Sequence, residues 1–195
     1  MVSPRAFPAE LVSLAVHDNG PFLVRRQAAR AFSGTGGLPN PDRAEVLASL
    51  MEVTERTGDP SRGAEVFKKN CASCHTHRGE GKTIGPDLTG MAVHPKEEIL
   101  AQIIDPSRSV EGNYRLSTVV TTDGIVIVGM LTSETKTAVE LIDSQGKSHV
   151  VLGEDIDSYV ASNKSVMPDG FEKQIDRQQM TDLLEFLTAK GQYLP

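Results

Sequence analysis

The sequence is poor in aromatic residues and in cysteine. Among its 195 residues there is no Trp, aromatic residues make up 5%, and there are two Cys. Two cysteines cannot build a disulfide framework or, alone, a four-thiolate zinc site. The 38% of hydrophobic and 24% of charged residues are typical of a soluble globular protein. With so little aromatic mass, we expect the core to need apolar volume from another source.

Long apolar runs and basic clusters are also missing. No stretch approaches the roughly 18 apolar residues that a membrane span requires. No basic run is interleaved with aromatic residues, as it is in many nucleic-acid binding proteins. The net charge of −6 favours weak, salt-screened attraction to basic patches on a partner. We therefore expect neither a membrane span nor nucleic-acid binding.

Helical periodicity dominates the beginning of the chain. Apolar residues recur at helical spacing over residues 22–32, and a second helix is predicted from Asp42, as its N-cap, to about Glu55. The run Val-Arg-Arg-Gln-Ala-Ala at 24–29 resembles part of a HEAT-type helical repeat. We therefore interpret residues 1–57 as a helical extension, either the end of a repeat array or a hairpin packed on the next domain.

The rest of the chain changes from helical to strand patterns and back. Between about 114 and 155, Val, Ile and Thr dominate. Two turns, Asp123-Gly124 and Ser144-Gln145-Gly146, separate four β-rich runs, which predicts a four-stranded antiparallel meander. The segments around this meander are predicted to be helical and lie at residues 62–70, 95–104 and 176–190.

The motif with the clearest chemistry is Cys71-Ala-Ser-Cys74-His75, the attachment signature of c-type haem. Two thiols that add across the two vinyl groups of a porphyrin must lie a few ångströms apart on one side of the ring. Two intervening residues on a helical turn give this spacing, and the next residue then directs its imidazole at the iron. The motif therefore predicts one covalently bound haem c, with His75 as an iron ligand.

Two other interpretations of the cysteine pair agree less well with the flanking sequence. A zinc site needs two more ligands, and the nearby His77 is closer to His75 than the usual spacing of histidine ligands. A thioredoxin-type redox motif follows a strand, whereas a helix is predicted before Cys71. No Ser-His-Asp set, phosphate-binding loop or paired-carboxylate signature indicates another chemistry. Haem attachment therefore remains the prediction.

The segments around the motif resemble class I cytochromes c. Gly63 and Phe67 on the predicted first helix, with Phe186 on the last, match the Gly and the aromatic pair that pack together in that family. The segment Gly-Pro-Asp-Leu-Thr-Gly at 85–90 is similar to the family's loop behind the proximal histidine. The resemblance implies that Pro86 backs onto that histidine.

The order of segments resembles more closely a haem-binding domain at the C-terminal end of planctomycete-type multidomain proteins. There, a helical-repeat region precedes the Cys-x-x-Cys-His motif, and a β-rich insert separates the Gly-Pro segment from a Met-Pro loop. Residues 58–192 follow this order. The resemblance implies a mainly α fold, with a cytochrome c core at 58–195, an antiparallel β insert at about 114–155 and an N-terminal helical hairpin.

The second axial ligand is predicted to be Met167. It is followed by Pro in the loop before the last helix, and the resemblance implies that a Met in this place is the distal ligand. Packing is the simpler interpretation of Met130 and Met180, and Met91 follows the Gly-Pro loop closely. A lone His is more often a surface residue than a ligand. Two histidines flank the haem loop and stay open as rivals, namely His77 and His94.

Together, these features predict a monohaem c-type cytochrome that transfers electrons to and from redox partner proteins without transforming a substrate. A labile sixth position would instead imply a haem peroxidase or a small-ligand sensor. The edge strands of the insert suggest a homodimer interface or a docking site for a dehydrogenase. Because bacterial covalent haem is attached outside the cytoplasm, we expect a periplasmic or otherwise extracytoplasmic location. Residues 1–20 do not resemble a secretory signal, so we expect a leader that was removed or that precedes this sequence.

Overall fold

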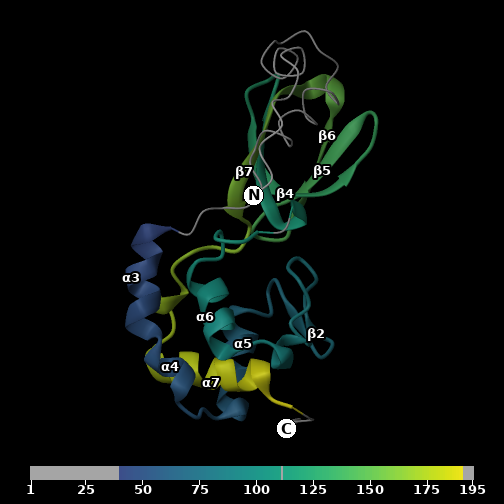
Figure 1. Ribbon diagram of the computed structural model, residues 1–195. Helices are drawn as coiled ribbons and strands as arrows, with labels where there is room; N and C mark the ends of the chain where they lie inside the picture. Colours follow the sequence, from purple (N-terminus) through teal and green to yellow (C-terminus); the bar gives the residue numbers. More distant parts are fainter. Residues whose placement is uncertain (1–39, 111, 191–195) are drawn as a thin grey trace, which may run out of the picture. The chain divides into compact units, whose positions relative to one another are not determined.

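The computed structural model describes residues 40–110 and 112–190 (Figure 1). These residues fall into two compact units: a helical unit of residues 40–110 and 165–190, and a sheet unit of residues 112–164. The chain therefore leaves the helical unit after Val110 and returns to it at Ser165. The helix predicted at 22–32 lies outside the described residues, as does most of the predicted extension.

Four α-helices of more than two turns and a single-turn helix build the described part of the helical unit. The helices predicted at 62–70, 95–104 and 176–190 are confirmed to within two residues at each end. The bounds are α3 (Pro41–Leu50), α4 (Glu52–Glu55), α5 (Pro60–Asn70), α6 (Lys96–Ile104) and α7 (Arg177–Thr188), with 3-10 turns η1 (Met91–Val93) and η4 (Phe171–Lys173).

Capping residues explain where the helices begin. Asp59 accepts hydrogen bonds from backbone N–H groups in the first turn of α5. Asp176 and Gln179 form a reciprocal capping box at the start of α7. The first residues of α5 and α7 are therefore set by capping residues that can be recognised in the sequence.

The prediction of one helix capped by Asp42 is wrong in two respects. Asn40 is the N-cap, because its side chain accepts a hydrogen bond from the backbone N–H of Asp42, and Pro41 is the first helical residue. The helix also ends at Leu50, and Met51 separates it from α4. The break leaves Leu50 and Val53 buried in the common core.

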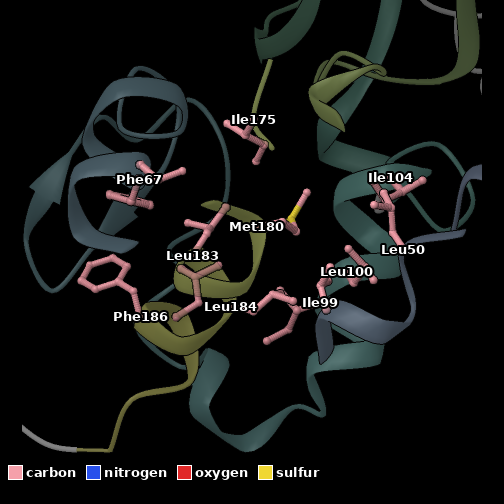
Figure 2. Packing of buried hydrophobic residues seen from close by; sticks show 13 residues of the cluster. Leu50, Phe67, Ile99, Leu100, Ile104, Ile175, Met180, Leu183, Leu184 and Phe186 are labelled. Atoms are coloured by element: carbon pink, nitrogen blue, oxygen red, sulfur yellow. The ribbon is translucent and has the colours of Figure 1, made fainter. Parts of the chain in front are cut away.

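The core of the helical unit lies where α5 packs against α7. A Cβ atom on Gly63 would lie 2.0 Å from the carbonyl oxygen of Asp182 and 2.6 Å from the Cβ of Phe186. Gly63 therefore permits a contact that any side chain would block. The rings of Phe67 and Phe186 pack with centroids 5.6 Å apart, so the expected packing of this Gly and aromatic pair is confirmed. Figure 2 shows the surrounding side chains, among them Ile99, Leu100, Ile104, Met180, Leu183 and Leu184.

The sheet unit is a five-stranded antiparallel sheet with the strand order β6-β5-β4-β3-β7 (Figure 1). The hairpin predicted at Asp123-Gly124 is confirmed, since Val120 pairs with Val126 across it. The second hairpin is confirmed by the pairing of Ile142 with Ser148. The bounds are η2 (Gly112–Tyr114), β3 (Arg115–Thr121), β4 (Val126–Glu134), β5 (Ala138–Ile142), β6 (Ser148–Leu152), η3 (Gly153–Asp155) and β7 (Ile156–Ser165).

Two expectations about the fold class need correction. The sheet has a fifth strand, β7, which the hydrophobic pattern did not predict because it is an edge strand whose one buried residue is Ile156. The fold is also not mainly α, since helix and strand are roughly balanced in the described part. The sheet has its own small core, formed by Val119, Val139, Leu141, Val151 and Ile156.

Candidate functional site

The cysteine motif continues from the C-terminal end of α5. The N–H groups of Cys71 and Ala72 both bond to the carbonyl of Phe67, at 2.7 and 3.0 Å. The N–H groups of Cys74 and His75 then bond to the carbonyl of Cys71, at 3.0 and 2.9 Å. These bonds wind the motif into a compact turn, and both cysteines are free thiols.

A short hairpin follows the motif. Strands β1 (Thr76–His77) and β2 (Glu80–Gly81) pair across a turn in which Arg78 and Gly79 have φ angles of 52° and 86°. Three backbone hydrogen bonds then join the loop over residues 82–88 to the motif and to the first residue of β1. They run from the N–H groups of Lys82, Gly85 and Leu88 to the carbonyls of Ala72, Cys74 and Thr76, at 3.0, 2.7 and 2.8 Å.

The loop brings Pro86 to His75. The Nδ1 atom of His75 lies 2.9 Å from the carbonyl oxygen of Pro86. A carbonyl only accepts hydrogen bonds, so Nδ1 carries the proton and donates it, and Nε2 of the neutral ring keeps its lone pair. Burial lowers the pKa of His75, against the opposing effect of the Pro86 bond, which favours the neutral ring. His75 is thus held in the tautomer that binds a metal through Nε2.

Gly85 makes this arrangement sterically feasible. A Cβ atom on Gly85 would lie 2.7 Å from Cε1 and 2.8 Å from Nδ1 of His75. The loop backbone therefore lies directly against the imidazole ring. Gly81 is similarly restricted, because a Cβ there would lie 2.1 Å from the His75 carbonyl oxygen. Gly85 thus packs against the imidazole ring of His75, and Gly81 packs against its backbone carbonyl.

The environment of Cys71 argues against thiolate chemistry. Burial, with a smaller contribution from neighbouring Cys74, raises the pKa of Cys71 to about 12. Redox-active and metal-binding cysteines need the thiolate form near neutral pH. In the described part of the chain, no group of three or more His, Cys, Asp or Glu side chains is placed to hold a metal ion. Neither the thioredoxin-type nor the zinc interpretation gains support from this geometry.

His77 lies inside the contact between α5 and α7. Its side chain is 3% exposed, and its ring centroid lies 4.6 Å from that of Phe186 and 5.8 Å from that of Phe67. Nδ1 bonds to the carbonyl of Leu88 at 3.0 Å, whereas Nε2 has no hydrogen-bond partner among the described residues. The sequence alone did not reveal this buried position. The three rings thus pack against one another inside the helical unit.

The remaining candidate ligands have ordinary structural surroundings. His94 is exposed and lies 3.2 Å from the carboxylate of Glu98. Met180 is 1% exposed in the helical core and Met130 is 6% exposed in the sheet, so the packing interpretation of both is confirmed. Met91 is partly buried and packs against the helical core.

Met167 lies in the loop between β7 and η4 and is half-buried. Its backbone N–H donates a hydrogen bond to Oγ of Ser165 at 3.1 Å. The N–H of Ser165 donates in turn to Oγ of Ser107 at 3.2 Å. All three residues belong to the helical unit that contains His75.

The described residues fit a covalently bound haem. Two free thiols stand three residues apart on one turn, and the adjacent imidazole has an available Nε2 lone pair. The cytochrome c family matches residues 60–126 of the chain. Residues 60–126 are a cytochrome c family domain. A cytochrome c domain with two cysteines implies covalent haem c.

Sequence relatives agree with this assignment over a short segment. Cytochrome c of Cochliobolus lunatus is 54% identical over 35 residues, which is 17% of this chain and 32% of that protein. Cytochrome c of Arabidopsis thaliana is also 54% identical over 35 residues, covering 17% and 31%. Cytochrome c of Stellaria longipes is 51% identical over 37 residues, covering 18% and 34%. The chain thus spans about a third of the length of the curated relatives it matches.

The family match ends at the start of β4, so the Met167 loop and α7 lie beyond it. The interruption by the sheet accounts for this, because the second part of the helical unit resumes only at Ser165. Among the described helices, none combines the length and the apolar character needed to cross a membrane.

Proposed function

We propose that this protein is a monohaem c-type cytochrome that carries out outer-sphere electron transfer. The observation that carries the proposal is the contact of His75 with the carbonyl of Pro86, next to two free cysteines inside a cytochrome c domain. Proteins of this family are typically electron-transfer proteins rather than enzymes. The bound iron would take up and release one electron, and the protein would adjust its potential through its ligands and its burial.

Each site residue has a distinct role in this proposal. Cys71 and Cys74 would hold the haem through thioether bonds, and His75 would bind the iron through Nε2. Pro86 fixes the tautomer and orientation of His75 through its carbonyl. Met167 would supply the second protein ligand of the iron and would keep small molecules from binding there. Bound haem would also add apolar volume to a chain that has few aromatic residues.

The proposal extends to partners and location. A monohaem carrier needs a donor and an acceptor protein, and the chain could equally be the electron-accepting domain of a larger dehydrogenase. We place the protein in the periplasm or another extracytoplasmic compartment, because covalent haem is attached there in bacteria. The division into a helical extension at 1–57 and a cytochrome c domain at 58–195 remains part of the proposal, with Leu50 and Val53 of the extension packed in the core of that domain.

Covalent haem attachment tests the proposal directly. The chain is expressed with a haem-attachment system, and covalent haem is detected by staining a denaturing gel. We expect haem to stay on the wild type and on the Ser73→Ala control, whose substitution lies at an exposed position between the cysteines. The Cys71→Ala, Cys74→Ala double variant loses it. Covalent haem on the double variant, or none on the wild type, would contradict the proposal.

The sheet unit favours a second role, homodimer formation through β6. In the described part of the chain β6 pairs on one side only, with β5. Val150 and Leu152 are 68% and 46% exposed, and the strand carries no charged residue, which leaves its edge unprotected. An antiparallel copy of β6 would bring Lys147 at one end near Glu154 and Asp155 at the other.

Size-exclusion chromatography with light scattering tests the dimer. We expect a dimeric wild type that becomes monomeric in Val150→Lys, because the new charge would face its own copy. Val160→Lys, at a 58% exposed position on the opposite edge strand β7, serves as the control and stays dimeric. A monomeric wild type at micromolar concentration would rule out this role.

A further inference from the structure

Two serines connect the segment after α6 to the loop that carries Met167. Oγ of Ser107 accepts a hydrogen bond from the N–H of Ser165, 58 residues further along the chain, at 3.2 Å. Oγ of Ser165 accepts the N–H of Met167 at 3.1 Å. The backbone of Met167 is therefore attached to the helical unit through two consecutive hydrogen bonds.

The first serine belongs to a firmly held turn. Ser107 is 8% exposed and Ile104, the last residue of α6, is fully buried. The carboxylate of buried Asp105 accepts a hydrogen bond from the backbone N–H of Asn40 at 3.0 Å. The N–H of Arg108 bonds to the carbonyl of Asp105 at 3.1 Å and closes the turn. Ser107 can therefore act as a fixed anchor for a segment that returns from the sheet unit.

The bond within the Met167 loop is a common local motif and carries little information alone. The same motif occurs nearby, where the N–H of Lys164 bonds to Oγ of Ser162 at 2.9 Å. Ser165 differs from Ser162 because its backbone N–H also donates a hydrogen bond to the buried Ser107, in a segment distant in sequence. Ser162 therefore provides a matched control for Ser165.

We propose that Ser107 and Ser165 are positioning residues for the sixth iron ligand. They hold the backbone of Met167, so that its thioether stays at the iron and competing ligands are excluded. This inference rests on the proposed function, in which Met167 binds the iron. The two serines act through the loop and do not themselves contact the haem.

The expected effect follows from the strength of one hydrogen bond. Removing a bond that holds the loop weakens the closed, Met-ligated state relative to an open one. The apparent affinity of an added ligand for the open state then rises, because a larger fraction of the protein is competent to bind it. A typical net hydrogen bond corresponds to about a threefold to tenfold change in such an equilibrium.

The experiment titrates the oxidised holoprotein with imidazole and follows the far-red sulfur–iron absorption band. We expect Ser107→Ala and Ser165→Ala to bind imidazole about threefold to tenfold more tightly than the wild type. Ser162→Ala should bind it like the wild type. Ser165→Thr, which keeps the hydroxyl, should also return to the wild-type affinity. If Ser107→Ala does not fold, Ser107→Cys, which keeps the size of the side chain but is a weaker hydrogen-bond acceptor, takes its place.

Met167→Ala separates a failure of this inference from a failure of the proposed ligand. If Met167→Ala leaves the sulfur–iron band unchanged, Met167 is not the ligand, and both the ligand assignment and this inference fall. If Met167→Ala abolishes the band while Ser107→Ala and Ser165→Ala bind imidazole like Ser162→Ala, only the positioning role is overturned.

Discussion

At the scale of single residues, the site depends on the fit between Gly85 and His75. The loop backbone approaches the imidazole so closely that a methyl group on Gly85 would lie 2.7 Å from a ring carbon. Real side-chain carbons do not tolerate this distance, so either the loop or the ring must move. Movement of either one weakens the Pro86 bond that orients His75.

Gly85→Ala should therefore impair the haem site. We expect less haem-loaded protein and a shifted reduction potential, because the imidazole loses its fixed orientation. Gly90→Ala is the matched control, since a Cβ on Gly90 would meet nothing within 4 Å. Haem content and spectroelectrochemical titration measure both effects. Equal haem content and equal reduction potentials of the two variants would show that the close contact of Gly85 with His75 does not affect the haem site.

Most site residues could be predicted from local sequence motifs. The others depend on tertiary contacts, which the local sequence does not indicate. Cys71, Cys74 and His75 lie within five consecutive residues, so their spacing alone indicated haem attachment. The contact of Pro86 with His75 came from a resemblance to known cytochromes. The buried position of His77 and the bond between Ser107 and Ser165 depend on segments distant in sequence, and no local pattern indicates either one.

At the scale of elements, a buried carboxylate joins α5 to α7. Asp182 on α7 is 2% exposed. Its carboxylate accepts hydrogen bonds from the Arg62 guanidinium at 2.8 Å and from the backbone N–H of Asp59 at 2.8 Å. Burial alone would raise the pKa of Asp182, but the bonds from Arg62, Asp59 and Gln178 outweigh it and lower the pKa.

This lowered pKa predicts an acid-dependent loss of stability. Because the pKa of Asp182 is lower in the folded than in the unfolded protein, its contribution is fully present above about pH 4. The contribution is lost as the pH falls through the folded-state pKa. Asp182→Asn should lower the free energy of unfolding at pH 7 by on the order of 1–3 kcal/mol, and the difference from the wild type should shrink in acid.

Urea unfolding of the holoprotein between pH 7 and pH 3 measures this contribution. Glu65→Gln on the exposed face of α5 is the control, and it should follow the wild type at every pH. A constant gap between Asp182→Asn and the wild type across this range would show that the carboxylate does not titrate as described.

Elements with strong local signals were predicted well, and polar elements were not. Helices α5, α6 and α7 all have helical apolar spacing, and α5 and α7 also have capping residues. The two glycine turns fixed the hairpins. Strand β7 has mostly polar side chains and is held by pairing with β3. Its pairing partner lies about 40 residues earlier in the sequence, so its local pattern gives too little information to assign it.

At the scale of the whole molecule, the sheet interrupts the helical unit without sharing its core. Each unit has a separate cluster of buried side chains. The N–H of Ser165 lies 3.2 Å from Oγ of Ser107, so the chain returns close to the point where it leaves. A short connection can therefore replace residues 111–164 with little loop-closure cost.

Replacing residues 111–164 with a short Gly/Ser linker should leave a folded protein that attaches haem. Circular dichroism and haem staining on a denaturing gel measure the two properties. The same linker in place of residues 91–104 is the control, and it should abolish folding because it removes Leu100 and Ile104 from the core. Failure of both variants to attach haem would mean that the helical unit needs the sheet to fold.

The absorption spectrum of the holoprotein in both oxidation states tests electron transfer most directly. A carrier with two strong axial ligands stays low-spin on oxidation and reduction, so little rearrangement accompanies each electron. We predict low-spin c-type spectra in both states, with a far-red sulfur–iron band in the oxidised form that disappears in Met167→Ala. A high-spin spectrum of the wild type would contradict the account, since an open iron would indicate a peroxidase or a small-ligand sensor.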